Sequence, residues 1–243
     1  MRKSIAMCAW MTVMALGMSS VMWKSHTGMF TTASTEAQMY VPPFRGAPAS
    51  RIGGGARGQC RASQEPGISL SVLTPVHTGF TVQDQPSLYW YLSQPVTDYA
   101  VEINLIDEKG VTPLFEIRLA PPVQAGVHRI RLADHHVRLS PGIHYRWSVA
   151  LICDPNSRSL DIVSAGSIER VTLPESLKAQ LERAARTDSP RLYAQAGMWY
   201  DAVQGFSELL EVAPHDAEAR QQRATLLEEG HLPDVAAYDR QQR

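Results

Sequence analysis

The sequence predicts an α+β protein in which an antiparallel β-sandwich is followed by a helical tail. Between residues 68 and 171, apolar side chains alternate with polar ones in short runs separated by turn residues. Alternation with a period of two, broken by turns about every 8 to 12 residues, is typical of an all-β sandwich. From residue 172 onward, apolar residues recur at the spacing of one helical face, so residues 172–243 are expected to be helical.

Composition favours a globular module and gives no sign of a nucleic-acid partner. The chain has 243 residues, 44% of them hydrophobic, and its 23 basic and 24 acidic residues give a net charge of −1. Long blocks of one charge sign, which favour nucleic acid or an anionic membrane surface, are absent from the sequence. We therefore expect a packed core and no nucleic-acid binding.

The N-terminus has the pattern of an export signal. Met1-Arg2-Lys3 is positively charged, and residues 4–23 are uncharged and mostly apolar. This is the pattern of a cleaved secretory signal, although the apolar run is also just long enough to be an uncleaved membrane anchor. In both cases residues 1–37 form a signal or anchor with its linker, and the rest of the chain is exported to the periplasm or cell envelope. A membrane contact is expected only through such an anchor.

Two cysteines remain after such a signal, Cys60 and Cys153. In an oxidising compartment a disulfide between them is the simplest interpretation. Zinc binding is less favoured because only these two cysteines remain after the signal and the sequence has no Cys-x-x-Cys motif. Two separate buried thiols are the remaining alternative.

Six strands can be placed within residues 68–171. Trp90 in one of them, and the Tyr145-x-Trp147 pattern in a later one, resemble immunoglobulin or fibronectin type III domains. The tryptophans are most simply core residues of the sandwich. The six predicted strands span residues 86–92, 99–106, 114–119, 127–132, 144–153 and 162–171.

Four helices are expected in the tail. Thr172 to Glu175 has the pattern of a capping box at the start of the first, and the other three are expected at residues 189–196, 198–212 and 216–229. The run from Gly197 through Ala202 to Pro214 resembles the second half of a tetratricopeptide repeat (TPR). Because about three such units are needed for a free-standing solenoid, this TPR-like segment must pack on the sandwich or on another chain.

A family resemblance spreads over residues 40–232. It is carried by residues 42–48, 53–58 with Cys60, 73–75, 89–91, 145–148, 153–155, 168–171 and 193–202. Together these residues resemble a bacterial domain-of-unknown-function family, number 928, of exported proteins from cyanobacteria and proteobacteria. A Thr is expected where Ala56 stands. The resemblance implies export and the domain layout, but no catalytic residue, since the family has no settled function.

The irregular segment at residues 38–67 contains the one motif that suggests a ligand. Gly53, Gly54 and Gly55 lie between Arg51 and Arg57, and Arg45 precedes them. Backbone amides of a glycine-rich segment can cradle an anion that guanidinium groups also hold. The sequence lacks the Gly-Lys-Ser/Thr ending of a P-loop, so a tight irregular segment held by Cys60 is the alternative interpretation.

Other polar and aromatic motifs have structural interpretations. Trp199-Tyr200 is expected to be core or to line a groove where a partner binds. Asp134-His135-His136 is expected to be a surface turn, because adjacent histidines on a strand point to opposite faces. We find no catalytic signature and predict no catalytic, cofactor-binding or metal-binding residue.

Three functions are compatible with these patterns. The first is a non-enzymatic interaction module that binds another envelope protein through its helices and Gly/Arg segment. The second is a carbohydrate- or anion-binding module that uses Arg51, Arg57 and exposed aromatic residues such as Tyr89 or Tyr91. The third is an unrecognised hydrolase, because catalytic triads are defined by geometry.

Overall fold

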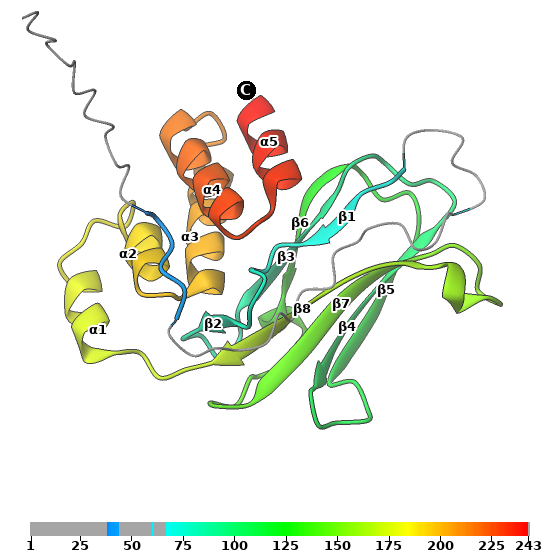
Figure 1. The fold of residues 1–243 in the computed structure, drawn as a ribbon, viewed down its shortest axis with the longest axis horizontal. Coiled ribbons are helices and arrows are strands. Elements are labelled where there is room, and N and C mark those ends of the chain that lie inside the picture. Colours follow the sequence, from blue (N-terminus) through cyan, green and yellow to red (C-terminus); the bar gives the residue numbers. More distant parts are fainter. Residues whose placement is uncertain (1–37, 44–59, 61–66, 243) are drawn as a thin grey trace, which may run out of the picture. The chain divides into compact units, whose positions relative to one another are not determined.

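The computed structural model describes residues 38–43, 60 and 67–242 (Figure 1). Its strands precede its helices, which confirms the α+β class. The strands are β1 (Leu70–Val72), β2 (Gly79–Thr81), β3 (Ser87–Leu92), β4 (Ala100–Asp107), β5 (Phe115–Leu119), β6 (Gly126–Arg131), β7 (His144–Ile152) and β8 (Ile162–Arg170). The α-helices are α1 (Glu175–Leu181), α2 (Ser189–Gln195), α3 (Trp199–Val212), α4 (Ala217–Glu229) and α5 (Pro233–Gln241).

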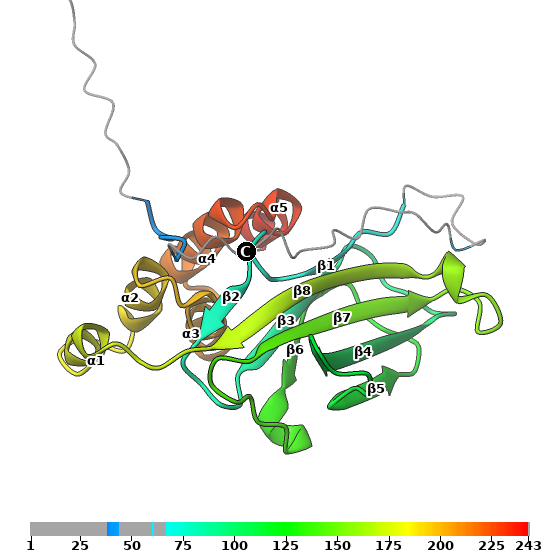
Figure 2. The same cartoon turned by 60° about the horizontal axis from the view of Figure 1, so that its bottom comes forward.

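The strands form two sheets. The smaller has the order β1-β3-β6 and is antiparallel throughout. The larger has the order β2-β8-β7-β4-β5 and is antiparallel except for the parallel pair β2–β8. Figure 2 shows the long strands β8, β7 and β4 running side by side, with the helices beyond β2.

All six predicted strands are present as β3 to β8, each within two residues of its expected bounds. The sequence analysis missed β1 and β2, which have three residues each. A three-residue strand is too short to establish an alternation, and all three residues of β2 are buried. Their place in the sheets comes from backbone pairing with β3 and β8.

The helical tail begins differently from the prediction. Thr172 does not form a capping box, because the N-cap of α1 is Pro174, with no side-chain cap. The three later predicted helices are present as α2, α3 and α4, but α5 was missed. No separate helix was predicted after the fourth one, which was expected to end at residue 229, whereas α5 begins at Pro233. Proline fits there because its missing N–H would have no helical acceptor.

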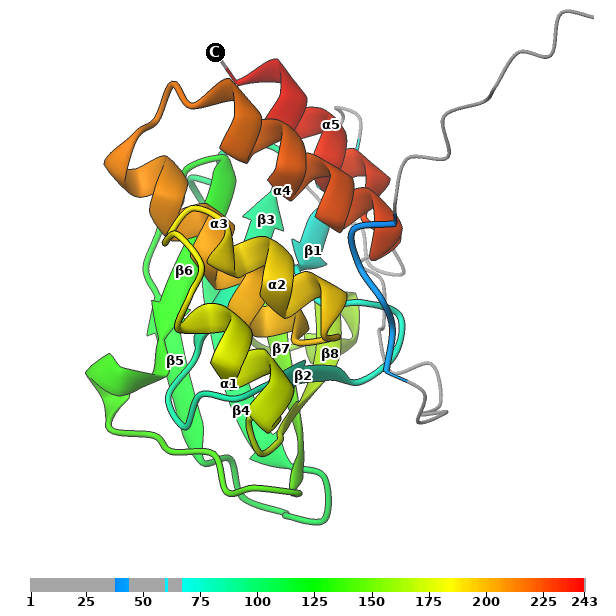
Figure 3. The same ribbon diagram turned by 90° about the vertical axis from the view of Figure 1, so that its left-hand side faces the viewer.

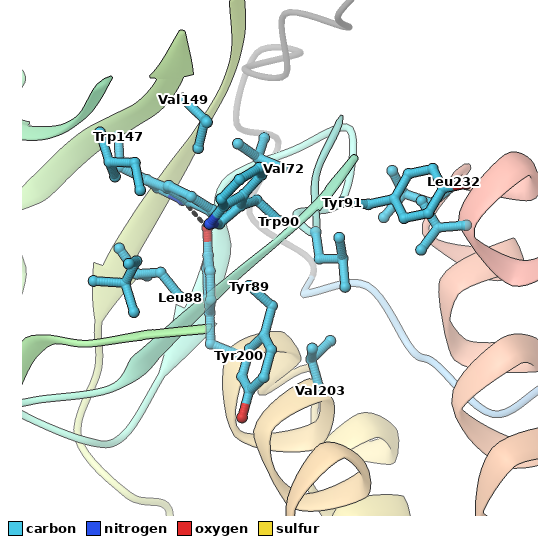
Figure 4. Packing of buried hydrophobic residues seen from close by; sticks show 14 of the residues in the cluster. Val72, Leu88, Tyr89, Trp90, Tyr91, Trp147, Val149, Tyr200, Val203 and Leu232 are labelled. Atoms are coloured by element: carbon cyan, nitrogen blue, oxygen red, sulfur yellow. Dashed lines mark hydrogen bonds between the residues drawn. The ribbon is translucent and has the colours of Figure 1, made fainter. Parts of the chain in front are cut away.

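Helices α2 to α5 pack on the strands and share the main hydrophobic core with them, whereas Leu177 of α1 packs in a smaller cluster with Phe80 and Met198. Trp199 and Tyr200, at the start of α3, are 0% and 1% exposed. The Trp199 indole Nε1 donates to the Leu73 carbonyl (2.9 Å), and the Trp147 indole Nε1 of β7 donates to the Tyr200 hydroxyl (2.9 Å; Figure 4). These bonds satisfy the buried indole N–H groups of Trp199 and Trp147.

Residues 38–43 lie against the helical region as an extended segment (Figure 3). The backbone amides of Met39 and Tyr40 both donate to the Glu229 carboxylate of α4. The Val41 amide donates to the Ala194 carbonyl of α2 (3.2 Å). Gly197 allows this approach, since its φ is +79° and an added Cβ would lie 3.0 Å from the Val41 carbonyl oxygen.

Cys60 and Cys153 form a disulfide bond, as the sequence predicted, with Cα atoms 5.0 Å apart. The bond joins the end of β7 to a residue 93 positions earlier in the chain. Within the residues that the structure describes, no helix is long and apolar enough to cross a membrane.

Candidate interaction groove

A groove of about 440 Å³ lies between α2 and α3. Pro190 and Tyr193 of α2 form one wall, and Leu209 and Val212 of α3 form much of the other. The helices approach closely at Gly205, where an added Cβ would lie 2.8 Å from Cγ of Pro190. The short helix α2 therefore rests on the middle of α3 and leaves a groove alongside it.

The rim of this groove is apolar and open to solvent. Val212, at the end of α3, is 82% exposed. Tyr193 and Leu209 are each only partly buried. A partner that covers these three side chains would remove apolar surface from water, which favours binding.

Asp201 is a buried carboxylate that also lines the groove. It is 2% exposed and lies in the first turn of α3, where the helix dipole favours a negative charge. Its carboxylate accepts hydrogen bonds from the Val82 amide (3.0 Å) and from Gln83 Nε2 (3.2 Å). It thus ties the segment after β2 to α3.

Burial raises the pKa of Asp201 from 3.8 to about 6, against the opposing effect of its hydrogen bonds. The Asp201 carboxyl therefore holds its proton more tightly in the folded protein than in the unfolded chain. The contribution of Asp201 to stability is largest below pH 3.8 and declines as the pH rises to about 6. The whole decline amounts to roughly 3 kcal/mol, since one pKa unit corresponds to about 1.4 kcal/mol.

An Asp201→Asn variant should lack this decline. The measurement is urea unfolding of both proteins at a series of pH values from 3.5 to 7. Titrating groups that both proteins share cancel in the difference between their free energies of unfolding. The wild-type free energy of unfolding should fall relative to that of the variant by about 2 to 3 kcal/mol over this range. Parallel pH profiles would show that the carboxylate titrates normally in the folded state.

Negative charge dominates the groove and its continuation. A second cavity of about 230 Å³ shares Thr187, Leu209 and Asp216 with the first and extends toward α4. Among the described residues that line the two cavities, Arg186 is the only cation. The carboxylates that line them are Asp188, Asp201, Glu208, Asp216 and Glu218.

Not every carboxylate of the groove is available to a ligand. Asp201 is held as described above, and Asp216 accepts from the Ala219 amide (3.0 Å) as the N-cap of α4. Glu208 accepts from Gln204 Nε2 (2.9 Å) and remains partly exposed. Asp188 and Glu218 are exposed at the rim. The surface offered to a partner is therefore an apolar strip bordered by acidic side chains.

Most of the contact residues proposed from the sequence fall outside the part of the chain that the structure describes. Arg45, Arg51, Gly53, Gly54, Gly55 and Arg57 lie outside the described residues. Trp199 and Tyr200 line neither cavity of the groove, and their burial fits the core interpretation.

The expectation that Tyr89 and Tyr91 are exposed aromatic residues was wrong, because they are 3% and 6% exposed. Every residue of β3 is buried. α3 packs against β3, and Tyr91 contacts Tyr238 of α5, with ring centroids 5.0 Å apart. When both faces of a strand are covered, the side chains on both faces are buried, even where polar and apolar residues alternate in its sequence.

The histidine motif is a surface turn, as expected. Leu132–His135 form a 3₁₀ turn, His136 adopts a left-handed conformation, and Asp134 to His136 are exposed. Within the part of the chain that the structure describes, no group of three His, Cys, Asp or Glu side chains could hold a metal ion.

Sequence reasoning missed Asp201 and its groove. The available signal was a single acidic residue within the otherwise apolar run from Gly197 to Val203. A carboxylate in the middle of a core-forming stretch is either exposed on the other helical face or buried with partners. Only the position of β2 decides between these possibilities.

The comparisons with known proteins agree with the resemblance noted in the sequence. No curated protein matches the chain. Residues 52–239, which include most of the described strands and helices, match one family. The chain therefore belongs to the family described as Domain of Unknown Function (DUF928).

Proposed function

We propose that this protein is a non-enzymatic interaction module of the cell envelope, and that its α2–α3 groove binds a basic, extended segment of another exported protein. The observation that supports the proposal best is an apolar strip bordered by the accessible carboxylates of Asp188, Glu208 and Glu218, with one guanidinium among the described lining residues. Apolar contacts would supply affinity, and charge complementarity would select lysine- or arginine-containing segments and speed their association.

The proposal includes a finer description of the fold. The strands would be an immunoglobulin- or fibronectin III-like sandwich that acts as a rigid support. The helices would be a TPR-like unit that presents the groove. In support, α2 and α3 pack closely where Gly205 meets Pro190, and the core of the helices is continuous with that of the sheets.

Export to the periplasm or cell surface is part of the same proposal. The charged start and apolar run of residues 1–23 support it. The Cys60–Cys153 bond supports it as well, because structural disulfides persist mainly in oxidising compartments. The partner would then be another envelope protein.

Peptide binding tests the groove directly. The probe is a fluorescent 12-residue peptide with alternating lysine and leucine, compared with a peptide in which glutamate replaces lysine. The double variant Glu208→Gln, Glu218→Gln should bind the basic peptide about 3- to 10-fold more weakly, because each exposed charge pair contributes about 0.2 to 1 kcal/mol. Glu116→Gln, an exposed change on β5, is the matched control. Equal affinity for both peptides would contradict the proposal.

Photo-cross-linking identifies the natural partner. A benzophenone amino acid replaces Val212 at the groove rim or, as the control, Val111 in the β4–β5 loop, which is 94% exposed. We expect Val212 cross-links to a basic segment of one exported protein, and we expect them to diminish in the Glu208→Gln, Glu218→Gln background. Cross-links to acidic segments would argue against the groove as the binding site. Cross-links that are equally frequent from Val111 would argue against it as well.

A further inference from the structure

A third cavity, of about 260 Å³, lies where the smaller sheet meets the helices. Tyr89 of β3 and Arg129 of β6 are paired in register across the sheet and line one side. Arg220 of α4 lines the helical side. The cavity is therefore bounded by elements far apart in the sequence, and it shares no lining residue with the α2–α3 groove.

The charges that line this cavity are unequal. Three guanidiniums, those of Arg129, Arg220 and Arg223, face two carboxylates, those of Glu211 and Asp239. Arg223 is held by Asp239, through Nε–Oδ2 and Nη2–Oδ1 distances of 2.7 and 2.6 Å. Arg129 forms an ion pair with Glu211 (2.8 Å), whose side chain is 48% exposed.

The third guanidinium has no acidic partner. Arg220 donates to the Pro214 carbonyl, and among the described residues it forms no ion pair. Within the described part of the chain, the guanidinium of Arg220 is thus met by a carbonyl dipole and by no carboxylate. One anionic group in the cavity would balance the charge of Arg220.

An unpaired donor points to the same conclusion. Tyr89 is 3% exposed, and its hydroxyl makes no hydrogen bond of normal geometry within the described residues. In Figure 4 this hydroxyl points away from Trp90 and Tyr200 and lies beside α3. Burial raises the pKa of Tyr89, against the opposing effect of the neighbouring Arg129 guanidinium, so the hydroxyl keeps its proton. A buried O–H without a hydrogen-bond acceptor destabilises the protein, and a ligand that supplies the acceptor removes this cost.

We propose that this cavity binds the phosphate group of a small phosphorylated molecule, held by Tyr89, Arg129 and Arg220. The donors approach from the sheet on one side and from α4 on the other. A tetrahedral oxyanion has oxygens in several directions and can accept from both sides, whereas a planar carboxylate is typically held by one guanidinium side-on. Glu211 competes with the ligand for Arg129 and moves aside, or shares it, when phosphate binds.

Titration with inorganic phosphate, followed by thermal unfolding and calorimetry, tests the site. Tyr89→Phe removes only the hydroxyl, so without phosphate its melting temperature should equal or exceed that of the wild type. With phosphate, its stabilisation should be largely lost, and Arg220→Gln should weaken phosphate binding by about tenfold. Glu211→Gln should strengthen binding, because it releases Arg129.

A control variant and two contrary outcomes complete the test. Arg191→Gln, an exposed change on α2, is the matched control and should leave phosphate affinity unchanged. Unchanged phosphate affinity in both Tyr89→Phe and Arg220→Gln would overturn the proposal. Weaker binding in Glu211→Gln would overturn it too, because that carboxylate would then assist the ligand.

The source of the phosphate is distinguished with two probes. Glycerol 3-phosphate represents a free small ester, and vesicles of phosphatidylglycerol represent a lipid headgroup, with phosphatidylcholine vesicles as their control. Binding of glycerol 3-phosphate that depends on Tyr89 and Arg220 supports a small phosphorylated ligand. Binding confined to phosphatidylglycerol vesicles would reject it in favour of a membrane surface.

Discussion

Replacing Arg223 by Ala should destabilise the protein by about 3 to 5 kcal/mol, because the change leaves the Asp239 carboxylate buried without its counter-charge. Asp239 is 0% exposed, and Arg223 is 8% exposed. The guanidinium also donates to the Ser207 hydroxyl of α3 (3.1 Å), so this one side chain connects α3, α4 and α5. Urea unfolding followed by circular dichroism measures the loss.

The same two helices provide the matched control. Arg240 of α5 pairs with Glu228 of α4 at the surface, where their side chains are 36% and 54% exposed. Arg240→Ala should cost no more than about 1 kcal/mol, because water screens an exposed pair. Losses of equal size in the two variants would show that the buried pair has no special role.

A double variant separates the pair from its charges. Arg223→Met with Asp239→Leu removes both charges together and fills similar volume. Its stability should equal or exceed that of the wild type, and so lie well above that of Arg223→Ala, since an apolar pair avoids the cost of removing charges from water. A double variant as unstable as Arg223→Ala would show that packing, and not charge, is the cause.

Loss of the Cys60–Cys153 bond should be the second large effect. The bond closes a loop between residues 93 positions apart, and in the chain-entropy model a loop of about this length is stabilised by roughly 4 to 5 kcal/mol. The Cys60→Ser, Cys153→Ser protein should therefore unfold at lower urea concentration. Measured losses of about 2 to 5 kcal/mol are usual for native disulfides.

Reductant provides the control for this prediction. Dithiothreitol should lower the stability of the wild type to that of the double-serine protein and should leave the variant unchanged. Non-reducing peptide mapping should find the Cys60 peptide joined to the Cys153 peptide. A wild type that is insensitive to reductant, with separate cysteine peptides, would contradict the bond.

Local patterns predicted most of the secondary structure, and they failed where the cause was not local. The alternation at β4, where buried Val101, Ile103 and Leu105 lie between half-buried neighbours, was readable because only one face is fully covered. At β3 the same alternation predicted that Tyr89 and Tyr91 are exposed. They are buried, because helices later in the chain pack on this strand. Periodicity indicates which residues share a face but does not indicate whether a second layer lies on it.

Sequence alone was sufficient for the α+β class, the order of strands before helices, the longer elements and the cysteine pairing. These depend on hydrophobic period, turn residues and a choice between only two available cysteines. Tertiary structure alone decided that Asp201 is buried beside β2, that α2 and α3 enclose a groove, and that Tyr89, Arg129 and Arg220 line one cavity. The reason is physical: burial and charge pairing depend on neighbours that are distant in the chain, and a local pattern does not contain them.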